Sequence, residues 1–137
     1  MAEIPGQVNK VVVAYPDGRR LKGYVFNFSA LRESFRLYPE ETSRQEEGTN
    51  VLMADLKAVF FVRDFAGDPG YHEAEEAPQT AHGRKVEVQF SDGEILHGLT
   101  EGYNPQRPGF FVFPADPKSN NHRIFVINKN ARKVRML

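Results

Sequence analysis

The sequence predicts an all-β fold made of two small five-stranded barrels in tandem. The first reason is an internal duplication: a shift of 75 residues aligns 10–62 with 85–137 without a gap and gives 12 identities in 53 pairs. The second is the pattern of short alternating apolar runs bounded by turns that contain Asp, Gly or Pro. A chain of 137 residues has room for two barrels of about 55 residues, but not for a large multi-domain enzyme.

Each copy is expected to contain five strands in the same order. An alternating apolar strand comes first, and an Asp-Gly pair at 17–18 or 92–93 then provides a tight hairpin turn. The returning strand carries Gly23 or Gly98 in its middle, where a sharp bend of a barrel strand best explains a glycine. The remaining strands are expected at 34–39, 50–54 and 58–62 in the first copy, and at 109–114, 123–128 and 133–137 in the second.

The segment between the copies separates two predicted domains. We expect a first barrel over 1–64, an acidic Gly/Pro linker over 65–83 and a second barrel over 84–137, because residues 63–84 lack apolar periodicity. The linker holds five candidate metal ligands, but their spacing matches no regular metal motif. They are His72, Glu73, Glu75, Glu76 and His82. We therefore expect no metal.

Composition excludes several classes of function. The formal net charge is zero, so any site for a polyanion must be local. Cysteine is absent, which excludes disulfides, thiol catalysis and thiolate metal sites. No apolar run approaches the roughly 18 residues of a membrane span, and residues 1–10 lack a signal-peptide core, so we expect a cytoplasmic protein without membrane contact. Neither a nucleophile motif nor a phosphate loop is present, which predicts a non-enzymatic protein without a cofactor.

The hairpin and the loop after it resemble the Sm-like fold of Sm, LSm and Hfq proteins, one of the SH3-like small barrels. Two glycines five residues apart are followed by an aromatic and a polar residue, which are Phe28 and Ser29 in the first copy and Tyr103 and Asn104 in the second. A short turn between two final strands completes the pattern at 51–62 and 125–137. The whole chain also resembles an uncharacterised family of short bacterial proteins.

The resemblance implies assembly and RNA binding. Sm-like proteins form rings by pairing the fourth strand of one barrel with the fifth strand of its neighbour, which implies a homo-oligomer. They bind RNA at the loops after the second and fourth strands, which implies single-stranded RNA or a nucleotide as a partner here. Carried over to this sequence, those loops present Ser29 and Asn104, then 54–57 and 129–132 with Lys129, Asn130 and Arg132.

One arginine in each copy stands out, because Arg32 and Arg107 are identical at the 75-residue offset. A planar guanidinium in a polar loop can bind an anion or phosphate. It can equally close its own loop by donating to backbone carbonyl groups. The basic hairpin that contains Lys129 and Arg132 likewise allows a binding face or a solvated face.

Two other functions are compatible with the residues. One is a protein-interaction or oligomerisation module that binds no nucleic acid. The other follows from a resemblance to PilZ domains, in which paired arginines and an Asn-x-Ser run bind cyclic dinucleotides, as Arg19, Arg20, Asn27 and Ser29 would here. Strongly salt-dependent binding to single-stranded RNA would favour the nucleic-acid function over the first of these.

The outward face of the first barrel is unusually apolar. Its positions Val12, Ala14, Phe26, Phe60 and Val62 correspond to Glu87, Gln89, Glu101, Arg135 and Leu137 in the second copy. A strand with two apolar faces must be covered on both. We expect the second barrel to cover this face, with the amino-terminal segment or a second subunit as alternatives.

Overall fold

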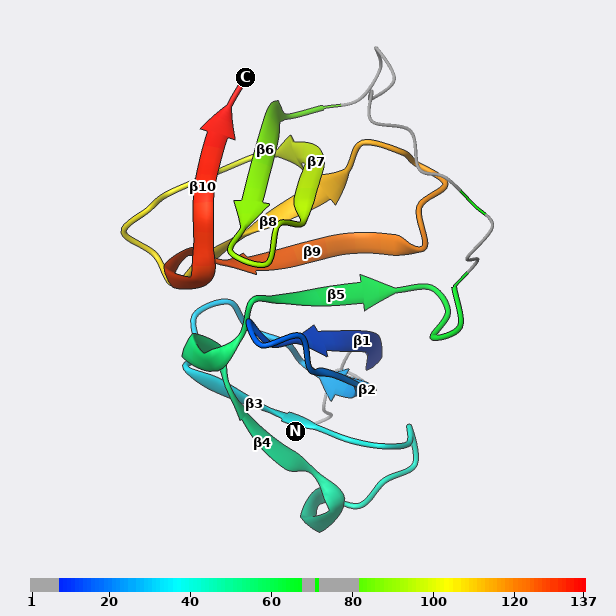
Figure 1. Cartoon of the computed structure of the whole chain (residues 1–137). Coiled ribbons are helices and arrows are strands. Elements are labelled where there is room, and N and C mark those ends of the chain that lie inside the picture. The colour runs from blue at the N-terminus through cyan, green and yellow to red at the C-terminus, as the bar shows by residue number, and fades with distance from the viewer. Residues whose placement is uncertain (1–7, 68–70, 72–81) are drawn as a thin grey trace.

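The computed structural model describes residues 8–67, 71 and 82–137, and it confirms an all-β protein (Figure 1). The strands are β1 (Val8–Ala14), β2 (Arg20–Phe26), β3 (Ser34–Leu37), β4 (Thr49–Leu52), β5 (Ala58–Val62), β6 (Arg84–Phe90), β7 (Ile95–Thr100), β8 (Gly109–Pro114), β9 (Asn121–Ile127) and β10 (Ala131–Met136). Single 3₁₀ turns precede β4, β5 and β10: η1 (Gln45–Glu47), η2 (Met53–Asp55) and η3 (Asn128–Asn130). Within the described ranges, no helix is long and apolar enough to cross a membrane.

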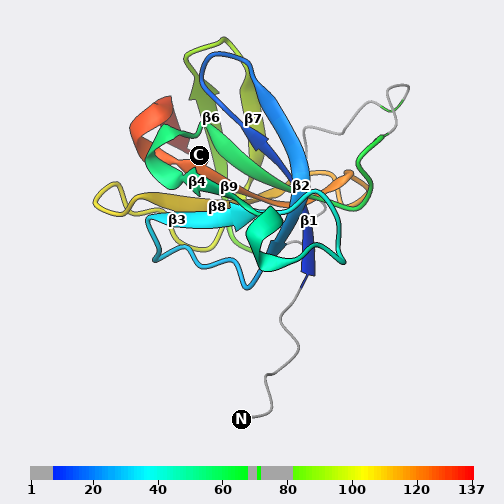
Figure 2. The same ribbon diagram turned by 90° about the horizontal axis from the view of Figure 1, so that it is seen from below.

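The strands form two antiparallel sheets that are joined by one isolated bridge. Eight of them form a sheet in the order β10-β6-β7-β8-β9-β5-β1-β2, and β3 pairs with β4 in a separate two-stranded sheet. Tyr24 and Tyr38 join β2 to the end of β3 through two backbone hydrogen bonds of 2.8 and 2.9 Å. Figure 1 shows β6–β10 on one side of β5 and β1–β4 on the other, and Figure 2 views the molecule from the β3–β4 end.

Strand pairing in the two halves of the chain has the same register. In the first half, the residues that face each other across the strands include Val11 and Gly23, Val13 and Val59, and Phe35 and Val51. The residues 75 positions later face each other in the second half: Val86 and Gly98, Val88 and Val134, and Phe110 and Val126. The turn glycines Gly18 and Gly93 have φ of 96° and 93°, as the Asp-Gly hairpin turns predict.

Close approach of the third strand explains the two mid-strand glycines. A Cβ at Gly23 would lie 2.6 Å from the carbonyl oxygen of Tyr38, and one at Gly98 would overlap the carbonyl oxygen of Phe113. These two obstacles are themselves 75 residues apart. At both positions the neighbouring backbone crosses too close to leave room for a side chain, and glycine is therefore required.

Two apolar clusters fill the molecule, and β5 and β9 contribute to both. Along β5, Val59 and Phe61 point into one cluster, whereas Phe60 and Val62 point into the other. Along β9, Phe125 and Ile127 join the first of these clusters, and Ile124 and Val126 join the second. Because side chains alternate across a strand, the two central strands are covered on both faces.

The predicted cover of the apolar outward face is confirmed at four of its five positions. Val12, Ala14, Phe60 and Val62 are at most 9% exposed and pack with Val86, Val88 and Phe90 of the other half. Phe26 differs, because its half-buried ring packs edge-on against Tyr38 at a centroid distance of 5.3 Å. The two apolar clusters thus each contain residues from both halves of the chain.

The predicted linker is described only at its two ends and at residue 71. Phe65 is anchored by a hydrogen bond of 3.0 Å from Lys22 Nζ to its carbonyl oxygen, and its ring packs edge-on against Tyr24. Of the five candidate metal ligands in the linker, only His82 lies within the described residues. The division into 1–64, 65–83 and 84–137 remains a prediction.

Candidate functional site at the junction of the halves

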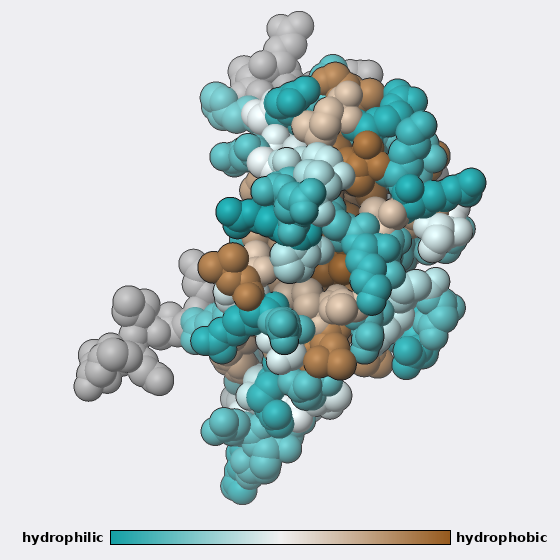
Figure 3. Space-filling model, turned by 90° about the vertical axis from the view of Figure 1, so that its left-hand side faces the viewer, coloured by the Kyte–Doolittle hydropathy of each residue, from teal (hydrophilic) through white to brown (hydrophobic). Residues whose placement is uncertain are grey.

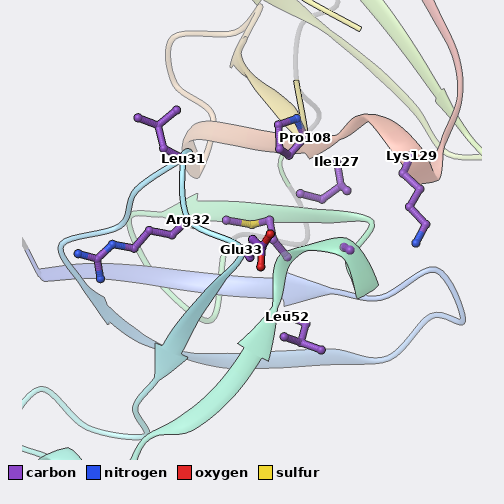
Figure 4. Close-up of a pocket in the computed structure, with 9 residues that line it drawn as sticks. Leu31, Arg32, Glu33, Leu52, Pro108, Ile127 and Lys129 are labelled. Atoms are coloured by element: carbon purple, nitrogen blue, oxygen red, sulfur yellow. The ribbon is translucent and has the colours of Figure 1, made fainter. Parts of the chain in front are cut away.

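A pocket of about 450 Å³ lies where loops of the two halves meet (Figure 4). The amino-terminal half lines it with the end of the β2–β3 loop and with the β4–η2 segment, and the carboxy-terminal half with the β7–β8 loop and the β9–η3 segment. Its lining residues are Leu31, Arg32, Glu33, Leu52, Met53, Ala54, Pro108, Ile127 and Lys129. Two of the predicted site residues, Arg32 and Lys129, are therefore brought together from separate halves.

The β2–β3 loop is shaped by local hydrogen bonds. Asn27 adopts a φ of 57°, and Ser29 Oγ accepts a hydrogen bond of 3.2 Å from the backbone N–H of Leu31. The N–H of Arg32 donates to the carbonyl oxygen of Ser29 at 3.3 Å, and the carbonyl of Glu33 accepts from the N–H of Met53 at 2.8 Å. Ser29 therefore supports the turn that presents Arg32 and Glu33.

The corresponding loop of the other half is closed by an asparagine that the sequence analysis missed. Asn128 Nδ2 donates to the carbonyl oxygens of Asn104 and Arg107 at 3.1 and 2.9 Å. Asn104 Oδ1 in turn accepts the backbone N–H of Gln106 at 2.9 Å. Asn104 is thus a turn residue, and Asn128, rather than the guanidinium of Arg107, closes the loop.

The predicted residues after β9 have three different positions. Lys129 lines the pocket. Asn130 Nδ2 donates to the carbonyl oxygens of Ala54 and Leu56 at 3.1 and 2.7 Å, which fixes η3 against η2. Arg132 is exposed in β10 and does not line the pocket. Of these three, Lys129 is placed to contact a ligand in the pocket.

The charged side chains of the pocket have no counter-ions within the described part of the chain. Arg32, Glu33 and Lys129 form no side-chain hydrogen bond or ion pair there. Figure 4 shows Arg32 and Lys129 at opposite ends of the pocket with Glu33 between them. Leu31 is 80% exposed and Leu52 50% exposed, so apolar surface is also uncovered here. Figure 3, which views the side with η2 and η3, shows apolar patches among hydrophilic residues.

A buried lysine fixes the same junction. Lys57 is 3% exposed, and its ammonium pairs with Asp92 Oδ2 at 2.6 Å and with the carboxylate of Glu94. It also lies 4.6 Å from the ring centroid of Phe90. The hydrogen bond from Lys57 and then the backbone N–H of Glu94 lower the pKa of Asp92 below its usual 3.8. Asp92 therefore has two roles: it forms part of the hairpin turn, and its carboxylate neutralises the buried ammonium of Lys57.

Arg123, near the start of β9, packs its guanidinium against two aromatic rings. The guanidinium carbon of Arg123 is 4.4 and 4.5 Å from the ring centroids of Phe61 and Phe111. Burial lowers the pKa of Arg123, and burial together with the charges of Arg63 and Arg123 lowers the pKa of His122 below 6.5. This basic segment lies outside the pocket and covers the edge of an apolar cluster.

The paired arginines of the cyclic-dinucleotide interpretation each have a carboxylate nearby. Arg19 Nε donates to Asp17 Oδ2 at 2.8 Å, and its guanidinium lies over the ring of Tyr15. Arg20 lies 3.8 Å from Glu94 and over the ring of Phe60. The first pair lowers the pKa of Asp17, mainly through the backbone N–H and then the side chain of Arg19.

Comparison with known proteins gives a family but no function. Neither the curated proteins nor the solved structures contain a match to this chain. The family model of DUF6982, described as a family of unknown function, matches residues 7–137. The chain therefore belongs to this family.

Proposed function

We propose that this protein is a non-enzymatic assembly module, built from two Sm-like or SH3-like barrels fused edge to edge, whose copies join end to end. The barrel interpretation is supported by the identical strand register of the two halves and by the two equivalent glycine crossings. Each half has the strand order fifth-first-second-third-fourth when its strands are numbered from its own start.

The pairing of β5 with β9 is the observation that carries the proposal. The fifth strand of the first half pairs antiparallel with the fourth strand of the second half, with Ala58 opposite Val126 and Phe60 opposite Ile124. The equivalent strands at the two free ends of the joined sheets are β10 and β4, and each pairs on one edge only among the described strands. The ends of one molecule are therefore complementary to the ends of the next.

The register of the internal joint predicts the register of the joint between copies. Shifted by 75 residues, it places Lys133 opposite Val51 and Arg135 opposite Thr49. Such a contact uses a different surface on each partner, so it propagates head to tail and gives a closed ring or an open filament. Strand addition at an exposed sheet edge supplies the backbone hydrogen bonds.

The two free ends, β10 and β4, carry opposite charges, and the β4 end also exposes an apolar residue. The β10 end carries Arg132, Lys133 and Arg135, whereas the segment before β4 carries the exposed carboxylates of Glu40, Glu41, Glu46 and Glu47. At the β4 end, Leu52 is 50% exposed, although its counterpart Ile127 at the internal joint is 1% exposed. The joint between copies is more polar than the internal one, so its strength should fall with salt.

Sedimentation velocity over a range of protein and salt concentrations tests the proposal. The wild-type chain should form larger species as protein concentration rises, and high salt should dissociate them. The double variant Arg132→Glu/Lys133→Glu should remain monomeric, whereas the control Arg107→Glu/Lys118→Glu should associate like the wild type. Adding a Glu41→Lys/Glu46→Lys chain should restore association of the double variant. A wild type that stays monomeric at every concentration would disprove the proposal.

A second candidate function is contact with single-stranded RNA or a nucleotide through the loops at the junction. It is favoured by one observation, that Arg32 and Lys129 from opposite halves line one pocket without counter-ions in the described residues. Fluorescence anisotropy with a labelled single-stranded RNA tests it. Arg32→Gln/Lys129→Gln should weaken binding, and Arg107→Gln, the same change at the equivalent loop position, should not.

A further inference from the structure

We propose that the junction pocket binds a guanine nucleotide, with the base against Glu33 and the phosphate at Lys129. The inference rests on the second candidate function and narrows it to a base and to an orientation. It does not require assembly, because one molecule supplies all the lining residues, although Leu52 belongs both to the pocket and to the free β4 edge.

Glu33 selects the base. Its carboxylate, an acceptor when ionised, lies between the two cationic ends of the pocket and has no side-chain partner in the described residues (Figure 4). Guanine presents two adjacent donors, N1–H and the N2 amino group, which match the two oxygens of a carboxylate. Adenine and cytosine place a ring-nitrogen acceptor beside the amino donor, and uracil offers a single N–H between two carbonyl oxygens. The carboxylate therefore favours guanine over the other three bases.

The apolar lining of the pocket suits contact with the planar faces of a nucleotide base. Six of the nine lining residues are apolar, and exposed Leu31 and Leu52 supply apolar surface that a planar ring would cover. A volume of about 450 Å³ lies within the roughly 300–1,000 Å³ range of small-molecule sites. A few polar groups on an apolar wall are the usual composition of a site that fixes ligand orientation.

Lys129 provides the contact for the phosphate. It lies at the end of the pocket opposite Arg32, and neither cation has an ion pair within the described part of the chain. With Glu33 ionised, the lining carries a net charge of plus one, which favours a phosphorylated ligand over the neutral nucleoside. An ammonium group binds phosphate as a point charge.

Titration of the full chain with single nucleotides, followed by NMR or calorimetry, tests the inference. The protein is kept at a concentration at which sedimentation shows monomer, because Leu52 also lies at the free β4 edge. GMP should bind at least about tenfold more tightly than AMP, CMP, UMP or guanosine. Lys129→Gln should reduce GMP affinity about tenfold, toward that of guanosine. Glu33→Gln should remove most of the preference for GMP over AMP, and Arg107→Gln should change neither.

Failure of this inference can be distinguished from failure of the function on which it rests. If AMP or single-stranded RNA binds in a Lys129-dependent way and GMP binds no better, the pocket is a nucleotide site and the guanine assignment is wrong. If neither GMP nor RNA binds the wild type, both fail. Unchanged circular-dichroism melting curves would show that each variant is folded.

Discussion

The ammonium of Lys57 lies 2.6 Å from Oδ2 of Asp92, so a buried ion pair links the end of η2 to the hairpin turn between β6 and β7. Asn130 adds a second contact between the halves, because its Nδ2 donates to the carbonyl oxygens of Ala54 and Leu56 and so holds η3 against η2. Polar interactions therefore fix the end of the junction that lies beside the pocket, and further hydrogen bonds join the halves at the other end of β5, where Arg63 Nε donates to the carbonyl oxygen of Ser119 at 3.1 Å.

Removing both carboxylates should destabilise the fold more than removing the lysine. Asp92→Asn/Glu94→Gln leaves the ammonium of Lys57 buried without a counter-ion, at a cost of about 1–3 kcal/mol in the free energy of unfolding. Lys57→Met leaves carboxylates that can turn to water, so its cost should be smaller. Urea denaturation measures both, with Asp17→Asn, the same change in the other hairpin, as control. Equal effects of all three variants would show that the pairing with Lys57 contributes nothing.

The stability of the protein should fall in acid through Asp92. Its pKa in the folded state is lowered, chiefly by the hydrogen bond from Lys57, whereas its pKa in the unfolded chain is near 3.8. The stabilisation is therefore complete well above pH 3.8 and is lost as the pH falls through that value toward the folded-state pKa. Urea midpoints of the wild type and of Asp92→Asn should converge over this interval. A difference that stays constant down to pH 2 would contradict this assignment.

Gly98 and Gly102, two of the glycines in the second half, should respond very differently to substitution. Gly98→Val forces a side chain into the carbonyl oxygen of Phe113 and Cγ1 of Val112, and should cost at least about 1 kcal/mol. Gly102→Val is a matched control, because a Cβ there meets nothing within 4 Å. Thermal melting should show a lower midpoint for Gly98→Val alone. Similar midpoints would rule out the strand crossing as the reason for the glycine.

Phe60 and Arg135 occupy equivalent positions in the two halves. A charged residue at position 60 should destabilise the fold, whereas an apolar residue at position 135 should not. Phe60→Glu places a charge in the cluster shared by the two halves, where burial of a phenylalanine contributes about 1.5–3 kcal/mol, so the chain should unfold. Arg135 is exposed, and Arg135→Phe should leave the melting midpoint nearly unchanged while it lowers solubility. A folded Phe60→Glu variant with wild-type stability would mean that packing of the second half on this apolar face does not stabilise the fold.

The strands and the covered face could be predicted because they depend on patterns within the sequence. Alternation and the Asp-Gly turns located the hairpins, and the exchange of Val12 and Phe60 for Glu87 and Arg135 showed which face needed a partner. Phe26 belonged to the same pattern, but its partner, Tyr38, lies within its own half. Pattern analysis identifies a face that needs burial but not the residue that buries it.

The site was predicted only in part, because its contacts join segments that are distant in sequence. Arg32 and Lys129 were identified separately, and only the fold shows that they share a pocket. Asn130 was selected as a ligand-binding residue but donates its side-chain hydrogen bonds to backbone carbonyls 74 and 76 residues away. Lys57 was included only as the end of the loop 54–57 that the resemblance assigns to RNA, because nothing in the local sequence distinguishes a buried paired lysine from a solvated one.

Cysteine cross-linking tests end-to-end assembly most directly, because the native chain contains no cysteine. The register at the internal joint places Thr49 of one copy opposite Arg135 of the next. Mixing a Thr49→Cys chain with an Arg135→Cys chain under mild oxidation should give a disulfide-linked heterodimer in excess of either homodimer, and substituting Lys118→Cys for Arg135→Cys should abolish it. A heterodimer yield no greater than that of the Lys118→Cys control would contradict pairing between β4 and β10.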